Sequence, residues 1–397
     1  MAPLLFRHCI YLAGVELGFS LVSAVILVSA WSISALGMGE QTLSIAGDPV
    51  LPFTATPEEA RRVAERHLED QADYLRSEWR EARLGEPALF RYVDRSPAVY
   101  VFPVIGKRGP SGYITVSAHR GKVPVIESAD EGEAPGRGAR EGTLVFVPPY
   151  TYSVMKYGQL RDLETSAVVS VSDARRITAL VESAAPRSIA SDAWHRYSTD
   201  EQFVQPMASY SRYISGVPNY TQRGNGCGHC AGAMLLAYWD KKGYPDLQSN
   251  KDDKNGSLLQ QCLATDMGPP PVTFAAAEDG IEYHANNKHT HLKTRVSYSC
   301  RYHFNAVRAK SLDRQKNSWP GFKREIENKR PVMVYHDWWY PVKQSSYHWM
   351  TAVGYYENTN VGERGYYVND CHGGARRYFN YDAYCDSISW LYVRPDR

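Results

Sequence analysis

The chain of 397 residues lacks an excess of either charge, since 45 Lys and Arg stand against 43 Asp and Glu. A formal net charge of +2 gives no indication of nucleic acid as a partner or of an acidic substrate. No internal repeat is visible. The hydrophobic fraction of 43% and the charged fraction of 22% are ordinary for a globular protein, and the length suffices for two or three domains.

The first forty residues are poor in charge and rich in apolar side chains. MAPLLFR carries a positive charge, and the run Leu17–Gly39 that follows soon after has no charged residue. This pattern predicts a signal peptide cleaved near Ala35, Gly37 or Ala46, where small residues are suitably spaced. The 23 residues of the run are also long enough for an uncleaved membrane anchor. Either alternative makes residues 1–39 a targeting segment and predicts that the remainder is exported, as a secreted or extracellular protein.

Cysteine is sparse, with seven residues in the whole chain. Disulfides are the default use of cysteine in an oxidising compartment, but their connectivity cannot be read from a sequence. If one thiol outside the targeting segment is a reduced nucleophile, five remain and at least one of these is unpaired. Cys9 belongs to the targeting segment, and the other six are Cys227, Cys230, Cys262, Cys300, Cys371 and Cys385.

Residues 56–84 give the clearest helical pattern of the front half. Thr56 is a predicted N-cap, Pro57 stands at the first helical position, and Glu59 completes a capping box. Four short strands are predicted next, in ALFRYV, AVYVFPVIG, GYITVSAHR and VPVIES, which together make a small antiparallel sheet. This part of the chain contains no constellation of catalytic residue types.

The middle of the chain contains a linker-like segment and a second helix. Residues 129–142 are rich in Gly, Pro and charge and predict a loop or linker. A helix is predicted over 171–186, capped by Ser172 or Asp173. After a polar stretch the composition changes near Gly216. A cysteine-bearing helix is predicted there, followed by a polar segment and then by strands rich in aromatic residues. The sequence therefore predicts an α+β protein with a front region at 50–205 and a second domain at 210–397.

The segment GNGCGHCAGAMLLAYW places Cys227 and Cys230 where a glycine-rich loop becomes an apolar helix that stops at Gly243. Three interpretations compete for the two cysteines. A zinc site requires a second ligand pair, and the HTH run at 289–291 does not have the usual spacing. The second interpretation is that both cysteines form structural disulfides. The third is a nucleophile, because the amides and the dipole of a helix N-terminus lower the pKa of a thiol.

A nucleophilic cysteine requires a base and an orienting group, and both occur downstream. His348 stands at the start of an apolar strand in SSYHWMTAVGYYEN, and GYYVNDCHGG ends a second strand at Asp370. Antiparallel pairing of these strands would bring the two residues together, with the carboxylate accepting the imidazole N–H. Cysteine, then histidine, then carboxylate is the chain order expected of such a unit.

In this order and spacing the segments resemble papain-fold cysteine peptidases, most closely the bacteriocin-leader-processing type and its secreted relatives. The matching segments are GVPNYTQ, CGHCAGAMLLAYWDKKGY, HWMTAVGYY and YVND, with the helix and strand of SWPGFKREIENKRPVMVYH before the histidine. The resemblance covers roughly 215–395. By position it implies that Cys227 is the nucleophile, His348 the base, Asp370 the orienting acid and Gln222 the oxyanion donor.

The chain departs from the family pattern at three places. His229 and Cys230 replace a proline and a small hydroxyl residue, Gln222 is about one residue closer to Cys227 than in the family, and Cys371 replaces a proline. In classical papain-like enzymes a C-G-x-C run has the second cysteine as nucleophile, so Cys230 remains the alternative to Cys227.

The front region is similar, more loosely, to the pro-segments of streptopain-like peptidases, through YITVSAHRG and VPVIESADEG. The resemblance implies an exported pre-pro-enzyme that hydrolyses peptide bonds in peptides or proteins, needs no cofactor or metal, and is restrained by its own pro-domain. Two other functions stay open: an amidase or acyltransferase with the same triad, and a non-catalytic binding protein on a peptidase-like fold.

Overall fold

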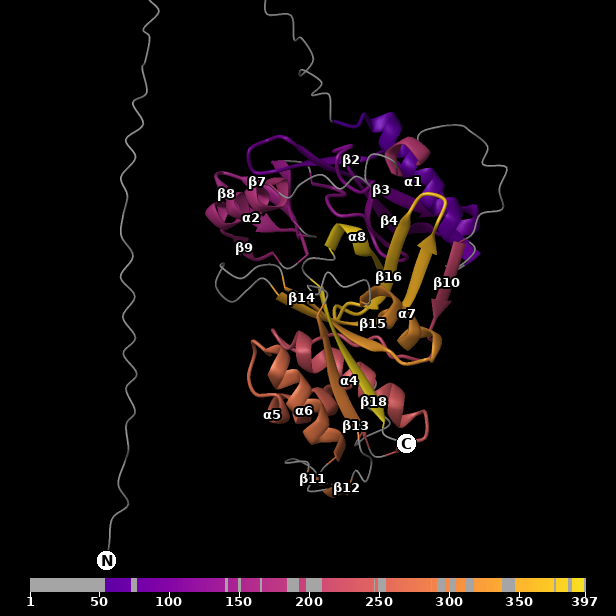
Figure 1. Ribbon diagram of the computed structural model, residues 1–397. Coiled ribbons are helices and arrows are strands. Elements are labelled where there is room, and N and C mark those ends of the chain that lie inside the picture. The colour runs from indigo at the N-terminus through magenta and orange to yellow at the C-terminus, as the bar shows by residue number, and fades with distance from the viewer. Residues whose placement is uncertain are drawn as a thin grey trace, which may run out of the picture. The chain divides into compact units, whose positions relative to one another are not determined.

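In the computed structural model the chain divides into two units, Met1–Pro49 and Val50–Arg397. The apolar run Leu17–Gly39 and the cysteines at 9, 300 and 385 lie outside the described residues. No helix in the described part is long and apolar enough to cross a membrane. The structure (Figure 1) describes residues 54–72, 77–139, 142–148, 151–164, 166–183, 193–197, 209–245, 247–248, 255–286, 288–290, 297–299, 304–310, 318–337, 347–374, 376–384 and 388–395.

The predicted capping box begins helix α1 (Pro57–Ala72). The Thr56 N–H donates to Glu59 Oε2 at 2.8 Å, and the Glu59 N–H donates to Thr56 Oγ1 at 3.2 Å. The two residues thus satisfy each other's backbone donors, as the sequence predicted. The helix is shorter than predicted, and a separate 3-10 turn η1 follows at Ser77–Glu81.

The front region continues as strands, and the four predicted ones are present as β2 to β5. Helix α2 begins at the predicted residue, but its cap differs: the Ser170 hydroxyl accepts the Asp173 N–H at 3.3 Å, so Ser170 caps the helix in place of Ser172 or Asp173. The elements are β1 (Arg83–Leu84), β2 (Ala88–Arg91), β3 (Pro97–Gly106), β4 (Gly109–Ser117), β5 (Val125–Ala129), β6 (Thr143–Val147), β7 (Thr151–Lys156), β8 (Gln159–Asp162), β9 (Val168–Val169) and α2 (Val171–Ser183).

The C-terminal region contains the predicted cysteine helix and strands, together with two helices that the sequence analysis missed. Helices α5 and α6 follow the cysteine helix, where strands had been expected directly after a polar segment. The elements are β10 (Ser209–Tyr213), α4 (Cys227–Asp240), α5 (Ser257–Asp266), α6 (Phe274–Asn286), β11 (Lys288–Thr290), β12 (Ser297–Ser299), β13 (Phe304–Lys310), α7 (Ser318–Glu327), β14 (Val332–Asp337), β15 (Tyr347–Asn358), β16 (Glu363–Asn369), β17 (Arg376–Asn380), α8 (Tyr381–Tyr384) and β18 (Ile388–Pro395).

One sheet runs through both regions. Its described strands follow the order β13-β18-β14-β15-β16-β17-β5-β4-β3-β2-β6-β7-β8-β9, with β1 beside β3 and β10 beside β15. The two regions join where β17 pairs with β5 in antiparallel fashion, with Tyr378 opposite Ser128. The fold is therefore mixed α+β, and the front region extends the sheet of the C-terminal region.

Helix α4 is buried along its whole length and packs on β15. The Thr351 hydroxyl on β15 donates to the Ala231 carbonyl oxygen at 3.0 Å, which fixes the first turns of the helix against the strand. Glycine at 228 also permits close packing of α4 against the segment before α6, since an added Cβ would lie 2.8 Å from Val272 Cβ. The start of α4 is thereby held beside the start of β15.

Helix α1 docks on the C-terminal strands through polar side chains. His67 Nδ1 lies 3.3 Å from Glu363 Oε1, and Asp70 Oδ2 accepts the Asn358 amide at 3.0 Å. Gln71 accepts the Tyr367 hydroxyl. These buried polar contacts lie within one hydrophobic core that extends through both regions, with Leu68 and Tyr356 among its members.

Candidate active site

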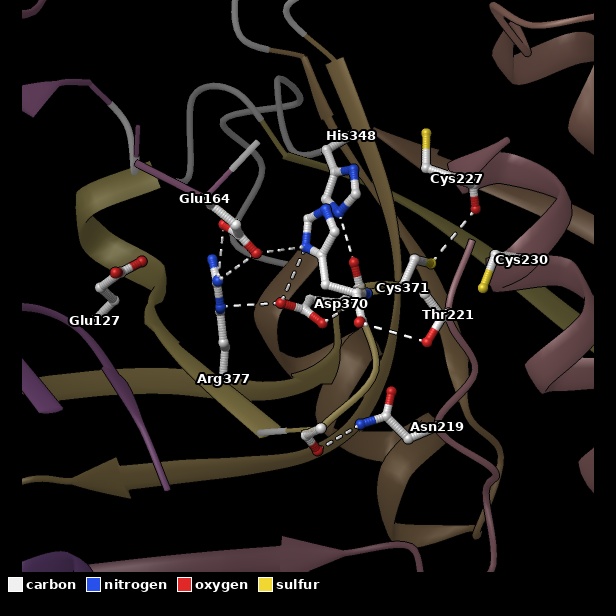
Figure 2. Close-up of polar contacts among 12 residues, drawn as sticks. Glu127, Glu164, Asn219, Thr221, Cys227, Cys230, His348, Asp370, Cys371 and Arg377 are labelled. Carbon is white, nitrogen blue, oxygen red and sulfur yellow. Dashed lines mark hydrogen bonds and ion pairs between the residues drawn. The ribbon is translucent and has the colours of Figure 1, made fainter. Parts of the chain in front are cut away.

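Cys227 is the first residue of α4 and is 6% exposed. The backbone N–H groups of Trp349 and Gly228 hydrogen-bond to its sulfur and favour the thiolate, but burial has the larger effect and raises the thiol pKa. The expectation of a depressed pKa at this helix start is therefore wrong. Figure 2 shows the Cys227 side chain directed away from the sulfur atoms of Cys230 and Cys371.

His348 lies at the start of β15, directly before the residue whose N–H contacts the Cys227 sulfur. Its Nε2 is 2.7 Å from the main-chain carbonyl oxygen of Asp370. A carbonyl oxygen only accepts, so Nε2 carries the proton and Nδ1 is the basic nitrogen. Burial, followed by the charge of His372, lowers the pKa of His348 to about 4. The imidazole is therefore neutral at pH 7.

Asp370 follows β16, which pairs with β15 as predicted, and Figure 2 shows it below the His348 ring. Its carboxylate accepts Arg377 Nε at 2.9 Å and the His372 N–H at 3.1 Å. Burial acts to raise its pKa, but Arg377 and His372 outweigh burial and hold the pKa well below the usual range. The residue thus contacts the base through its main-chain oxygen, while its side chain binds Arg377 and His372.

Three residues that the sequence analysis did not single out surround this carboxylate. The His372 ring stacks on the His348 ring at 5.2 Å between centroids and 6° between planes. Its Nδ1 lies 3.4 Å from both Asp370 Oδ2 and Glu164 Oε1. Arg377, on β17, also reaches Glu164 at 3.2 Å. The NDCHGG turn already marked His372 as a neighbour of Asp370, but Glu164 belongs to the front region and no local pattern links it to the site.

A metal ion has candidate ligands in this cluster. Glu164, Asp370 and His372 offer ligand atoms within 4.8 Å of one another, and they are the one such group in the described part of the chain. The Arg377 guanidinium pairs with both carboxylates, however, and already supplies the positive charge that a cation would bring. Neither Cys227 nor Cys230 belongs to this group, and the histidine side chains of the run at 289–291 lie outside the described ones.

Gln222 lies in the segment that leads into α4. Its backbone N–H donates to the Cys371 carbonyl oxygen at 2.6 Å, so this segment is bonded to the turn that follows Asp370. Its side-chain Oε1 is buried and has no hydrogen-bond partner among the described groups. This oxygen can therefore accept a further hydrogen bond.

Cys230, one helical turn after Cys227, is 0% exposed. Its sulfur donates to the Tyr220 carbonyl oxygen at 3.4 Å. Cys371 is equally buried, and its sulfur lies 3.5 Å from the Cys227 carbonyl oxygen and 3.3 Å from that of Trp349. Cys227, Cys230 and Cys371 are all free thiols, and so is Cys262 on α5.

Comparisons with known proteins match part of the chain. Residues 214–394 match the model of the Peptidase C39-like family. Among solved structures the chain is similar to the crystal structure of UfSP from C. elegans, at 14% identity and a TM-score of 0.29, over 50% of this chain and 36% of that one. No curated protein matches the chain. The family match contains the candidate nucleophile, base, acid and amide, and it supports a papain-like cysteine peptidase.

Proposed function

We propose that the protein hydrolyses peptide bonds, with Cys227 as nucleophile and His348 as base. The observation that carries this proposal is the local order of β15: the Cys371 thiol bridges the carbonyl oxygens of Cys227 and Trp349 at 3.5 and 3.3 Å, and the residue before Trp349 is a histidine with a fixed tautomer. The match of residues 214–394 to a peptidase family supports the same assignment. Burial of Cys230 against the Tyr220 carbonyl favours Cys227 over Cys230.

The resting site holds a neutral thiol and a neutral imidazole, because burial raises the pKa of Cys227 and lowers that of His348. His348 Nδ1 takes the thiol proton as the sulfur attacks the carbonyl carbon of the substrate. The imidazolium then gives this proton to the departing amine, which leaves an acyl-thioester. Water attacks the thioester with His348 again as base, releasing the acid and restoring the thiol.

Charge develops on the carbonyl oxygen of the substrate during both attacks. We propose that Gln222 donates to this oxyanion through its side-chain Nε2, which the position of Gln222 before α4 and inside the family match supports. A side-chain amide in this role contributes about 3 kcal/mol to transition-state stabilisation. Asp370 keeps His348 in the required tautomer through its main-chain oxygen, and its side chain anchors the turn on Arg377.

The front region is proposed to be a restraining pro-region, corresponding to residues 50–205. Its α1 docks on β15 and β16 through polar contacts, β5 pairs with β17, and the Asp130 carboxylate binds Arg376 at 2.8 Å. Glu164 extends from it to the cluster around Asp370. Release after cleavage would therefore separate both these polar contacts and the hydrophobic core that the two regions share. The charge-free run at 17–39 supports an exported or membrane-anchored precursor.

The peptidase proposal is tested with full-length protein and a mixture of peptides whose products are identified by mass spectrometry. We expect hydrolysis by the native protein and by Cys262→Ala, a matched control for loss of a thiol outside the site. Cys227→Ala should lose at least about 1,000-fold in kcat/KM with unchanged circular dichroism. Full activity in Cys227→Ala, with loss in Cys230→Ala, would reverse the assignment of the nucleophile.

The pro-region is tested by placing the recognition sequence of a specific protease in the segment 198–208, so that the intact protein is folded before it is cut. Cleavage should raise peptidase activity at least several-fold, more so at dilutions where the two parts separate. An unchanged or lower activity after cutting and separation would instead identify the front region as a permanent accessory domain.

Export is tested by fusing residues 1–50 to a reporter, whose retention inside the cell contradicts the proposal.

A further inference from the structure

Two thiols that the proposed mechanism does not use lie directly behind the nucleophile. Cys230 and Cys371 are both 0% exposed, and the Cys371 thiol hydrogen-bonds to the carbonyl oxygen of Cys227, one turn before Cys230 on α4, at 3.5 Å. In Figure 2 their sulfur atoms lie on the same side of the start of α4, whereas the sulfur of Cys227 points away from them. The pair therefore occupies a volume separate from the one in which Cys227 reacts.

The backbone encloses this pair from both sides. The segment before α4 contacts each cysteine, since the Tyr220 carbonyl oxygen accepts the Cys230 thiol at 3.4 Å and the Gln222 N–H donates to the Cys371 carbonyl oxygen at 2.6 Å. The two residues come from α4 and from the turn after β16, which are far apart in sequence. Their approach is thus a property of the tertiary structure and is fixed by hydrogen bonds on both partners.

The conformation of Cys371 is a second observation. Its φ is +69°, in the left-handed region that glycine and asparagine adopt most readily. The same turn uses glycine at 373 and 374, with φ of +72° and +102°. Cysteine is therefore not the residue that the backbone at 371 favours, and the reason for a cysteine there lies in what its sulfur contacts.

We propose that Cys230 and Cys371 form a redox site, whose oxidant is a small disulfide of the glutathione type. The thiolate of one cysteine attacks the small disulfide, forming a mixed disulfide and releasing one small thiol. The second thiolate then attacks the protein sulfur of the mixed disulfide and releases the other small thiol. The protein pair loses two electrons and two protons, and the oxidant becomes two thiols. Because both sulfurs are buried, the reaction proceeds during folding or when the turn opens.

A disulfide between Cys230 and Cys371 would link the two segments that form the candidate site. Cys230 belongs to the helix that begins at Cys227, and Cys371 follows Asp370, whose main-chain oxygen contacts His348. A disulfide between them would fix this oxygen relative to the nucleophile and leave Cys227 reduced. The inference does not depend on peptidase activity, because the bond is detected chemically.

The first test is a map of the thiols. Full-length protein is refolded, and in parallel incubated in its native state, in glutathione buffers from reducing to oxidising. It is then denatured without reductant, alkylated and digested with trypsin. We expect a peptide containing Cys227 and Cys230 to be linked to the peptide containing Cys371, two hydrogens lighter than the separate peptides. Fragmentation between Cys227 and Cys230 should place the alkyl group on Cys227 and the link on Cys230, while Cys262 is alkylated.

The second test is thermal stability. Oxidation should raise the Tm of the native protein and of Cys262→Ser by at least about 5 °C, since the bond closes a long loop. Cys371→Asn, which tolerates the left-handed backbone, and Cys230→Ala should show no such rise. Alkylation of both cysteines in every buffer would overturn the inference, and so would a link from Cys227 to either of them. The thiol map on native protein decides the matter even if a variant fails to fold.

Discussion

Desolvation shifts the pKa of an ionisable side chain in each region of the continuous sheet, and in the C-terminal region that side chain, His348, lies on the strand that packs against the helix of the proposed nucleophile. In the front region, burial raises the pKa of Glu127 on β5 to about 7, and the hydroxyls of Tyr113 and Tyr152 donate to it at 3.1 and 2.6 Å. In the C-terminal region, burial lowers the pKa of His348 to about 4. Desolvation thus perturbs a pKa in either region, and reactivity requires in addition a nucleophile such as Cys227 close to the perturbed group.

The sharpest test of this comparison replaces, in each region, the side chain whose pKa is shifted. His348→Ala should reduce kcat/KM by at least about 1,000-fold, because the thiol at Cys227 then has no base to take its proton. Glu127→Gln, which keeps the shape of the side chain, should stay within about threefold of the native rate. The rates are measured on one peptide substrate. An equal loss in both variants would remove the distinction between the two regions.

A smaller loss is expected for Asp370→Asn. The variant keeps the main-chain oxygen that contacts His348 but loses the ion pair with Arg377, which holds the turn in place. We expect kcat to fall by about 10- to 100-fold with little change in KM. Asp382→Asn is a matched control, because Asp382 is also a buried acid paired to an arginine, Arg364, outside the site. A similar fall of kcat in the control would indicate a general loss of structure.

The pH profile tests the electrostatic account of the base. His348 has to be neutral to accept the thiol proton, so activity should be lost as the pH falls through about 4. His372→Phe keeps the stacked ring but removes the charge that lowers the His348 pKa, and the acid limb should move toward neutral pH. Unfolding is followed separately by circular dichroism. The unfolded chain protonates His348 near pH 6.5, whereas the folded chain protonates it only near pH 4. The free energy of unfolding should therefore fall as the pH drops from about 6.5 to about 4. An unmoved acid limb in His372→Phe would contradict this account.

The smallest effect is expected from Glu164→Gln, the front-region residue that reaches the cluster. Its side chain is 47% exposed, so solvent screens its pairs with Arg377 and His372, and such pairs contribute about 0–1 kcal/mol. We expect a change in kcat/KM of less than about fivefold, measured at low and high salt. A loss as large as that of Asp370→Asn would make the front region an integral part of the active site.

The sequence predicted much of this arrangement because its signals are local. The capping box of Thr56 and Glu59, the helix that begins at Cys227 and the strands that hold His348 and Asp370 each follow from neighbouring residues. Antiparallel pairing of adjacent strands then brings histidine and aspartate together, but the prediction that the Asp370 carboxylate contacts His348 is wrong, because the main-chain oxygen of Asp370 does so.

The remaining features depend on contacts between distant segments. The pairing of β5 with β17 and the approach of Glu164 to Arg377 join residues far apart in sequence, and no periodicity encodes them. The pKa of Cys227 was expected to fall at a helix start, but the depth of burial, which the sequence does not give, raises it. Helices α5 and α6 were missed in a stretch expected to form strands.

The central claim is that Cys227 is the thiol activated by His348. The most direct measurement treats full-length protein with a peptide that carries a thiol-reactive electrophile at its scissile position, and maps the adduct by mass spectrometry. The account predicts one adduct, on Cys227, formed at least about 100-fold more slowly in His348→Ala, while Cys262, whose pKa burial raises to about 11, stays unlabelled over the same time. Labelling of Cys230, or labelling of Cys227 at a rate that does not depend on His348, would contradict the account.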